Sequence, residues 1–401
     1  MNSASDFSRE VDLAIVGGGI AGLWLANVLH ARGFEVIVLE AGRLGGQQTL
    51  ASQGMIHGGL KYALGGNLTG ASEAIADMPE RWRTCLNGTG EIDLTALTPL
   101  SERYYLFADA STLGRLTGFF ASKSLRGRIE RLNPADYPPV FQDPGFNGVV
   151  YALNDLVLDT PALLAHLQGN LPGRIFQHKL TPGEVVAGDS RPEKGVELQI
   201  EGGTIAARRL ILCAGAGTQQ LLDGLQIPTP QMQLRPLHQV VVRHAYPHPL
   251  YAHCLTGIRR AEPRLTITSH PDADGWLWYL GGQLASDGAT MSEGELVAHA
   301  RRELAACVPW VAWREAEFST IRVDRAEPRQ SGRQRPDEAF AATTDNVVVC
   351  WPTKLSLAPD LADKVLALAG PPPPRPTADG GGLPLRPAVL GEPPWALQGK
   401  E

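Results

Sequence analysis

The clearest pattern of apolar and polar positions lies near the amino terminus, over residues 11–40. An apolar run at 13–16 precedes three consecutive glycines, an apolar stretch of helical length up to Arg32, and a β-branched run that ends at Glu40. Short apolar runs bounded by turn residues are typical of buried strands, and longer ones of helices. The pattern therefore predicts a strand, a tight turn, a helix and a second strand.

The glycines of this turn, Gly17, Gly19 and Gly22, have the G-x-G-x-x-G spacing. In such a turn the first glycine permits the sharp bend, the second lets the backbone approach a pyrophosphate, and the third lets the helix pack closely on the strand. Glu40 follows Gly22 by 18 residues, where an acidic side chain can accept hydrogen bonds from an adenosine ribose. We therefore predict a dinucleotide site. The alternative, a turn without a ligand, carries the entropic cost of three glycines.

The segment after Glu40 does not continue the alternation of strand and helix. Residues 41–49 and 51–62 are rich in glycine and polar side chains. A nicotinamide-dependent dehydrogenase typically keeps alternating strands and helices at this point. A glycine-rich loop suits a flavin better, because the backbone has to follow the pyrophosphate and ribityl chain toward the isoalloxazine ring. A nicotinamide-dependent dehydrogenase remains the alternative.

The rest of the chain contains segments with the periodicity of helices and segments with that of strands. Its last part has neither periodicity. Ser292 and Glu295 form a capping box that predicts a helix start. From Gly370 the sequence becomes rich in proline, which predicts an extended tail; we expect a spacer or an arm lying on the body rather than a docking motif. Further helices are expected at 70–86, 112–132, 160–167 and 355–369. Strands are expected at 103–108, 265–268, 276–284, 318–325 and 346–350, and short strands and hairpins over 174–213.

Composition narrows the class of protein. The chain of 401 residues is long enough for two domains, and its net charge of -6 argues against a nucleic-acid partner. Its five cysteines are widely spaced and form no C-x-x-C, so we expect buried free thiols and no metal site. The polar first twelve residues do not read as a signal peptide, and no run outside 11–40 approaches the ~18 apolar residues of a membrane span. We expect a soluble, cytoplasmic protein without an integral membrane segment.

Several of these segments resemble one family. The opening glycine motif and IHGGLKY at 56–62 resemble the FAD-dependent oxidoreductases that include D-amino-acid oxidase, glycine and sarcosine oxidases and flavin-linked glycerol-3-phosphate dehydrogenases. IHGGLKY is most similar to the HGGLRY-like segment of the last group. VLDTPAL at 157–163 resembles the family's G-x-VDP-x-x-L element, and the small residues at 213–217 resemble its second FAD-contacting turn. The turn at 351–354 resembles its last FAD motif. The resemblance covers most of residues 11–369, in patches.

The resemblance implies an α/β (α+β) fold. It has a Rossmann-like, glutathione-reductase-type FAD-binding domain of the ββα kind and a discontinuous, mixed-sheet substrate domain like that of p-hydroxybenzoate hydroxylase. On this basis we divide the chain into an FAD-binding domain (9–85, 148–235 and 330–370), a substrate or cap domain (86–147 and 236–329) and the proline-rich tail (371–401).

The same resemblance, together with the glycine motif, assigns residues that contact FAD. Lys354 is of interest because a cation near the flavin pyrimidine edge stabilises the charge of the reduced ring; a surface lysine in a turn is the alternative. The expected FAD contacts are Gly17, Gly19, Ile20, Ala21, Gly22, Glu40, Ala41, Gly42, Ser52, Gln53, Gly54, Met55, Leu180, Ala214, Gly215, Trp351, Thr353, Lys354 and Leu355.

Catalytic residues are harder to assign, because the cofactor supplies the redox step and the protein orients the substrate. Members of the family commonly hold the substrate carboxylate with arginine, the side chain suited to bidentate recognition. Our candidates are His57, as a base or a polar contact or only a backbone partner, with Lys61, Tyr279 and Arg325. Weaker candidates are Arg259, Arg322, His238 and His253.

We therefore expect an FAD-dependent oxidoreductase that moves a hydride from a small, anionic amine or amino acid to flavin N5, with oxygen or another electron acceptor. Alternatives are a dehydrogenase of a hydroxy acid or polyol phosphate, and an FAD-binding protein without turnover. The chain departs from both branches of the family. It lacks the R-P-x-T-P-D-G-x-P-x-x-G stretch of the amine oxidases before its last strand, and the longer helical C-terminal domain of the glycerol-3-phosphate branch. The substrate therefore stays open.

Overall fold

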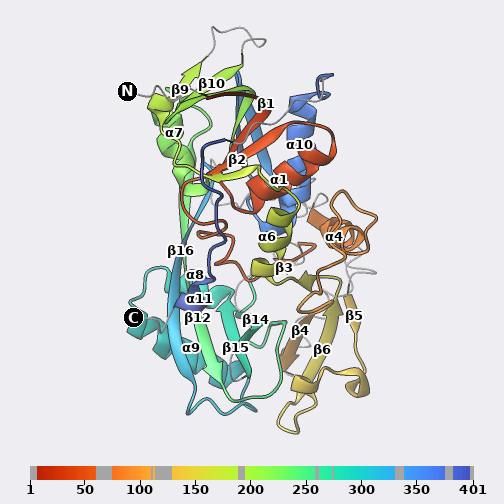
Figure 1. Ribbon diagram of the computed structural model, residues 1–401. Coiled ribbons are helices and arrows are strands. Elements are labelled where there is room, and N and C mark those ends of the chain that lie inside the picture. The colour runs from red at the N-terminus through yellow and green to blue at the C-terminus, as the bar shows by residue number, and fades with distance from the viewer. Residues whose placement is uncertain are drawn as a thin grey trace.

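The computed structural model describes residues 7–59, 75–109, 112, 129–187, 195–257, 262–272, 275–329, 338–374 and 383–397. The strands among these residues form two eight-stranded sheets, one above the other in Figure 1, and a two-stranded ribbon that lies between them. This mixed α/β architecture confirms the predicted fold class.

The upper sheet is built around the predicted strand–turn–helix unit. Its central strands are parallel and run in the order β18, β11, β1, β2, β8, with β17 antiparallel at one edge and the β9–β10 hairpin on β11. The strands are β1 (Phe7–Val16), β2 (Val36–Glu40), β8 (Ile175–Gln177), β9 (Val185–Ala187), β10 (Val196–Ile200), β11 (Gly203–Leu212), β17 (Phe340–Thr344) and β18 (Val347–Trp351).

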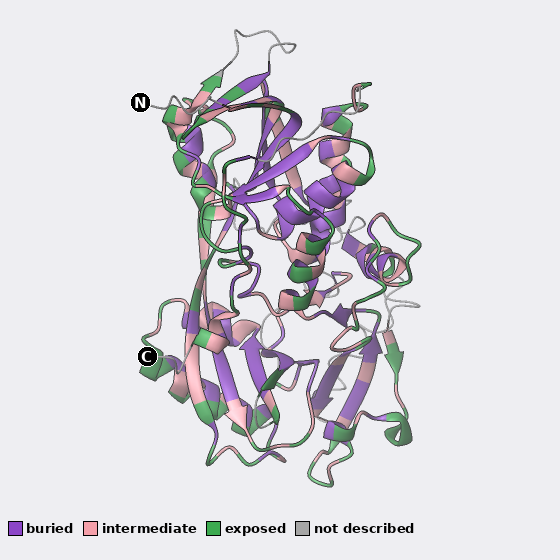
Figure 2. Cartoon of the chain, viewed as in Figure 1, coloured by how far each residue is buried: buried purple, intermediate pink, exposed green. Residues whose placement is uncertain are grey.

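Period-two alternation divides the apolar residues of this sheet between its two faces. Ile15 of β1 and Val38 of β2 pack under the helices, whereas Val16 and Leu39 pack against the opposite face. The helices on the first face are α1 (Ile20–Ala31), α4 (Met78–Leu86), α6 (Thr160–Gly169) and α10 (Ala358–Ala369), and α7 (Thr218–Gly224) covers the second. Both faces are therefore buried, as parallel sheets require (Figure 2).

The lower sheet is largely antiparallel, in the order β16, β12, β15, β14, β13, β4, β6, β5. The helices α8 (Gln283–Gly288) and α9 (Glu293–Cys307) pack on one face, and α9 begins at the predicted capping box of Ser292 and Glu295. The strands are β4 (Tyr104–Asp109), β5 (Ile129–Arg131), β6 (Gly148–Leu153), β12 (Met232–His244), β13 (Ala252–Cys254), β14 (Leu265–Asp272), β15 (Gly275–Gly281) and β16 (Glu317–Pro328).

Some predicted elements differ from the structure. Residues 148–153 were assigned to the FAD-binding part, whereas β6 pairs with β4 in the lower sheet. The helix expected at 70–86 is described from residue 75, and α4 proper starts at Met78. Most of the helix expected at 112–132 lies outside the described residues, and residues 129–131, at its expected end, form a strand that pairs with β6. Among the described helices, none has the length and apolarity needed to span a membrane.

The described part of the carboxy-terminal segment lies on the body of the protein. Gln177 donates to Arg386 O (2.8 Å) at the β8 edge of the upper sheet, and Leu44 donates to Val389 O (2.9 Å) in the loop after β2. The chain then descends to α11 (Pro394–Leu397), beside β12 in Figure 1. The arm therefore joins the two sheets.

Candidate active site

The turn between β1 and α1 has little room for side chains. Gly17 has a φ of +107°, and a Cβ there would lie 2.4 Å from Cys213 O. A Cβ on Gly22 would lie 1.9 Å from Gly17 O. Leu23 N donates the first hydrogen bond of the helix, to Gly19 O (3.0 Å). The N–H groups of Ala21 and Gly22 therefore have no acceptor within the helix. This cradle of glycine backbone and helix N-terminus fits a pyrophosphate, as predicted from the spacing.

Glu40 braces the same turn. Its carboxylate accepts hydrogen bonds from Gly18 N (2.6 Å) and Gly42 N (2.7 Å), one on each oxygen. Each oxygen retains lone pairs for further donors, so the assignment of Glu40 to a ribose stays a prediction. Thr49, which the sequence did not single out, accepts from Ile20 N (3.1 Å) and caps the helix from the following loop.

One other segment predicted to contact FAD, at 214–215, meets the same turn from elsewhere in the chain. Ala214 lies against Gly17, and Gly215 takes the left-handed conformation, with a φ of +56°. Leu180 is buried in the core on the face of the sheet opposite α1. The tertiary structure thus brings β1, β2 and β11 ends together at one edge of the parallel sheet, where dinucleotides bind in doubly wound folds.

The turn at 351–357 lies between the upper sheet and the ribbon β3 (Met55–Ile56) and β7 (Leu156–Val157). Thr353 has a φ of +61°, an uncommon conformation for a β-branched residue. Ser356 is fully buried; its hydroxyl accepts from His57 N (3.0 Å) and donates to Met55 O (3.4 Å). Trp351 is a core residue packed against Phe340, so its ring is used for packing.

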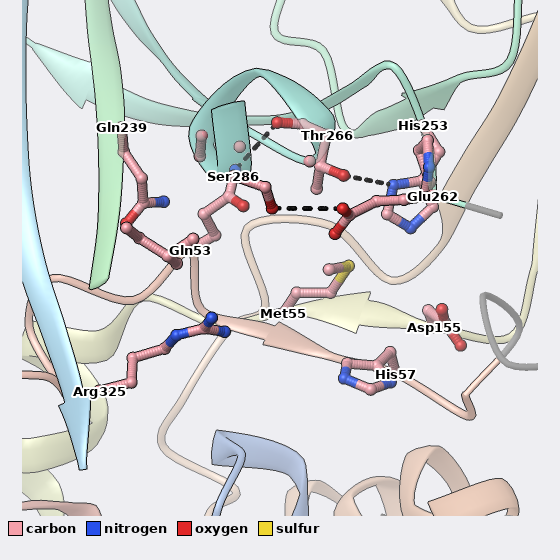
Figure 3. Close-up of a pocket in the computed structure, with 15 residues that line it drawn as sticks. Gln53, Met55, His57, Asp155, Gln239, His253, Glu262, Thr266, Ser286 and Arg325 are labelled. Atoms are coloured by element: carbon pink, nitrogen blue, oxygen red, sulfur yellow. Dashed lines mark hydrogen bonds between the residues drawn. The ribbon is translucent and has the colours of Figure 1, made fainter. Parts of the chain in front are cut away.

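A polar cavity of about 120 Å³ opens between this turn and the lower sheet (Figure 3). Its size fits a small molecule rather than a nucleotide. Its lining residues come from the loop after β2, the ribbon, β12, β15 and β16, and the β13–β14 and α8 region. They are Gln53, Met55, His57, Asp155, Leu237, Gln239, His253, Glu262, Pro263, Thr266, Gly281, Gly282, Ala285, Ser286 and Arg325.

Arg325, a catalytic candidate, lies at this cavity. Alternation along β16 places Ile321, Val323 and Arg325 on one face of the sheet, and the first two pack in the core cluster beneath the cavity. Figure 3 shows the guanidinium directed into the cavity, across from Glu262 and Ser286. The cavity therefore has a cationic side and a side with acceptor oxygens.

His57 lies at the edge of the cavity. Its Nδ1 accepts a hydrogen bond from Gly59 N (3.2 Å), so the neutral ring carries its proton on Nε2. In that tautomer the remaining ring nitrogen is a donor, which favours the polar-contact role over the role of base. Lys61 and Arg259 lie outside the described residues.

Tyr279 does not line the cavity. It is completely buried in the core of the lower sheet, and burial raises its pKa well above the ordinary value. Its hydroxyl lies 2.9 Å from Ala51 O and 2.9 Å from the Gln239 carboxamide. The hydroxyl of Tyr279 therefore reaches the cavity through Gln239. The predicted direct contact with a substrate has no support in this geometry.

The weaker candidates divide between the two faces of the lower sheet. His253 lines the cavity and its Nδ1 lies 2.9 Å from the Thr266 hydroxyl. His238 is buried on the opposite face with Nδ1 3.2 Å from Gly288 O, and burial lowers its pKa. Arg322 donates to Met291 O (2.6 Å) on that face. Neither His238 nor Arg322 reaches the cavity.

Sequence reasoning missed several cavity residues, above all Gln239, Asp155 and Glu262. Gln239 shares the alternation of Val241 on β12, so the strand pattern contained a signal for its face. Asp155, which accepts from Gly58 N (2.9 Å), and Glu262, which accepts from Ser286 Oγ (3.2 Å), lie in short loops without periodicity. Nothing in the local sequence distinguishes them from surface acids.

A glycine cradle at the edge of a parallel sheet, joined to an antiparallel sheet across a small polar cavity, defines a dinucleotide-dependent enzyme. Comparison with known families specifies the class: the model of the FAD dependent oxidoreductase family matches residues 12–349. The chain belongs to this family, whose cofactor is FAD, and the protein is an FAD-dependent oxidoreductase.

Individual relatives agree with this assignment. The probable FAD-dependent oxidoreductase PA4991 of Pseudomonas aeruginosa is 48% identical over 360 residues, which is 89% of this chain and 90% of that protein. Its crystal structure superposes with a TM-score of 0.81, at 41% identity and over 98% of this chain and 99% of the other.

More distant structures share the fold. Glycine oxidase of Geobacillus kaustophilus has a TM-score of 0.63 at 17% identity, over 90% of this chain and 95% of that one. L-α-glycerophosphate oxidase of Mycoplasma pneumoniae, solved with FAD bound, has a TM-score of 0.61 at 14% identity, over 96% of this chain and 99% of that one.

Proposed function

We propose that this FAD-dependent oxidoreductase oxidises a small, anionic amine or amino acid. The observation that carries the proposal is the polarity of the cavity, which has Arg325 on one side and the oxygens of Gln53 and Glu262 on others. A guanidinium matches a carboxylate, and acceptor oxygens match an amino group. FAD, when bound, supplies the hydride acceptor.

In this proposal the residues of the chain orient the substrate rather than react with it. Arg325 fixes the anionic group, and the facing oxygens fix the amino group, so the carbon to be oxidised is held between them. The Nε2–H of His57 supplies a further hydrogen bond at the edge of the cavity. Gly17, Gly22 and the start of α1 would hold the pyrophosphate of FAD.

A hydroxy acid or a polyol phosphate is the second candidate substrate. A segment of 66 residues is 41% identical to aerobic glycerol-3-phosphate dehydrogenase of Escherichia coli, but this segment is 16% of this chain and 13% of that protein. The guanidinium of Arg325 can bind a phosphate as well as a carboxylate. The family assignment itself favours FAD over the nicotinamide alternative.

Anaerobic reduction of the bound flavin tests the proposal. The purified holoenzyme is mixed without oxygen with a panel of amino acids, N-methyl amino acids, hydroxy acids and glycerol 3-phosphate. Bleaching of the flavin absorbance by one or more amines supports the proposal. Bleaching by hydroxy acids or glycerol 3-phosphate alone contradicts it, and no bleaching by the whole panel supports an FAD-binding protein without turnover.

A further inference from the structure

The hydroxyl of Tyr279 has two close partners but a single proton. It lies 2.9 Å from Ala51 O and 2.9 Å from one of the two terminal atoms of the Gln239 carboxamide. The carbonyl of Ala51 can only accept a hydrogen bond, so the hydroxyl proton goes to Ala51. Since burial keeps Tyr279 protonated, this donation persists over the working pH range.

The end of Gln239 that faces Tyr279 must then be a donor. Two oxygens without a proton between them repel one another at 2.9 Å, and Tyr279 is completely buried, so water cannot intervene. The nitrogen and oxygen of a carboxamide have nearly the same shape, and their positions are assigned from hydrogen bonds. With Nε2 toward Tyr279, the hydroxyl has one donor and one acceptor partner. The carbonyl oxygen of Gln239 then faces the cavity.

Gln53 has its orientation fixed in the same way. Its Nε2 donates to Tyr279 O (2.8 Å) and to Thr266 O (3.1 Å), both of which can only accept. Its Oε1 is left on the cavity side, where a Cβ on Gly281 would lie 2.4 Å from it. Both carboxamides line the cavity, and Figure 3 shows them opposite the guanidinium of Arg325.

We propose that Gln239 is a specificity-determining residue whose carbonyl oxygen, paired with that of Gln53, receives the N–H groups of the substrate. An amine offers at least two N–H donors when protonated or primary, whereas a hydroxyl offers one O–H. Two acceptor oxygens therefore select an amine over the hydroxy acid of the same skeleton. This inference rests on the proposed function and adds to it the residue that distinguishes an amine from a hydroxy acid.

The orientation of Gln239 depends on Tyr279, and Trp395 packs behind Tyr279 with ring centroids 5.1 Å apart. The carboxy-terminal arm thereby supports a residue of the cavity wall. Replacing Tyr279 by phenylalanine removes the acceptor that holds Gln239 Nε2. The carboxamide is then able to turn its nitrogen to the cavity, where it suits a hydroxyl oxygen.

The test uses holoenzyme variants and matched ligands. The amines are glycine, sarcosine and D- and L-alanine, the hydroxy acids are glycolate and D- and L-lactate, and acetate and propionate lack both groups. Rate constants of anaerobic flavin reduction at low substrate give the preference for amine over hydroxy acid, and spectral titration of the flavin gives the affinity for acetate and propionate. FAD content and thermal unfolding report on folding.

We expect Gln239→Met to lower the amine rate constant at least tenfold, with less than a twofold change in affinity for acetate or propionate. Tyr279→Phe is expected to lower the preference for amine over hydroxy acid at least threefold while FAD is retained. Gln199→Met, at an exposed position of β10, should leave both quantities unchanged.

Two results overturn the inference, and they differ from one another. If an amine reduces the flavin and Gln239→Met changes amine and hydroxy acid equally or not at all, the assignment of Gln239 is wrong while the proposed function stands. If only hydroxy acids reduce the wild-type flavin, both are wrong.

Discussion

Two glycines hold the turn between β1 and α1 in a shape that a side chain disrupts. Gly22→Ala would place a Cβ 1.9 Å from Gly17 O, so the helix has to move away from the strand. Because the cradle for the pyrophosphate is built from this contact, we expect the variant to bind FAD at least tenfold more weakly. Measurement of FAD release by fluorescence checks this.

Gly169→Ala is the matched control for that change. Gly169 ends α6, and a Cβ there would have no heavy atom within 4 Å. The variant should keep FAD and gain up to ~1 kcal/mol of unfolding free energy, because alanine is the better helix former. Equal FAD affinity of the Gly22 and Gly169 variants would contradict the role of the turn.

The charge of Arg325 leads to a prediction about substrate binding. A hydrogen bond to a charged group contributes about 1.5–3 kcal/mol, so Arg325→Met should raise KM for an anionic substrate on the order of tenfold to a hundredfold. Arg325→Lys should raise KM less than Arg325→Met does, since lysine keeps the charge but loses the bidentate geometry. Steady-state kinetics with the best substrate of the panel measure both variants.

Arg329→Met provides the control for Arg325, because Arg329 follows the same strand and is exposed. Its KM should match that of the wild type. A KM for Arg325→Met close to the wild-type value would remove Arg325 from the substrate site.

At the scale of elements, the carboxy-terminal arm covers part of the lower sheet. Trp395 is 6% exposed and packs against Tyr279 and, at 4.5 Å between ring centroids, against His270. Trp395→Ala removes a large buried ring, a change that typically costs about 3–5 kcal/mol of unfolding free energy. Denaturant unfolding should show this loss. Leu397→Ala, at a residue 54% exposed, should change stability by less than ~1 kcal/mol.

The packing of His270 under the arm predicts a pH dependence of stability. Burial lowers its pKa from 6.5 to about 4, so the unfolded chain binds a proton more readily than the folded one. The contribution of His270 to stability is complete above pH 6.5 and is lost as the pH falls toward 4, by up to about 3 kcal/mol. His270→Gln, which cannot take up a proton, should flatten the unfolding free energy over this window. An unchanged slope would contradict the assignment.

At the scale of the whole molecule, FAD binding should stabilise the folded chain, because the expected cofactor contacts come from several elements far apart in sequence. A ligand at 100 times its Kd adds about 2.7 kcal/mol to the free energy of unfolding. The apoprotein should therefore unfold at a temperature that rises with FAD concentration. FMN, which lacks the adenosine half, should raise it far less, since the glycine cradle and Glu40 then have no ligand. Thermal unfolding with each flavin measures the difference.

The sequence by itself was sufficient for the strand, turn and helix at the centre of the upper sheet and for the family. Gly17 to Glu40 form a local unit in which glycine spacing, apolar periodicity and turn residues all agree. The strand, turn and helix could therefore be predicted from residues close together in the chain. The capping box at Ser292 followed for the same reason. FAD as cofactor followed from the resemblance of short segments, each with its own local geometry.

The cavity was decided only by the tertiary structure. Alternation shows that Gln239 and Val241, or Ile321 and Arg325, share a face, but not what that face meets. The loop after β2 brings Gln53 under β14 and β15, and the arm places Trp395 behind Tyr279; both contacts join residues far apart in sequence. Hydrogen-bond partners then indicate which atom of each carboxamide faces the cavity. Such contacts depend on where distant segments lie in the folded chain, so the local sequence pattern cannot predict them.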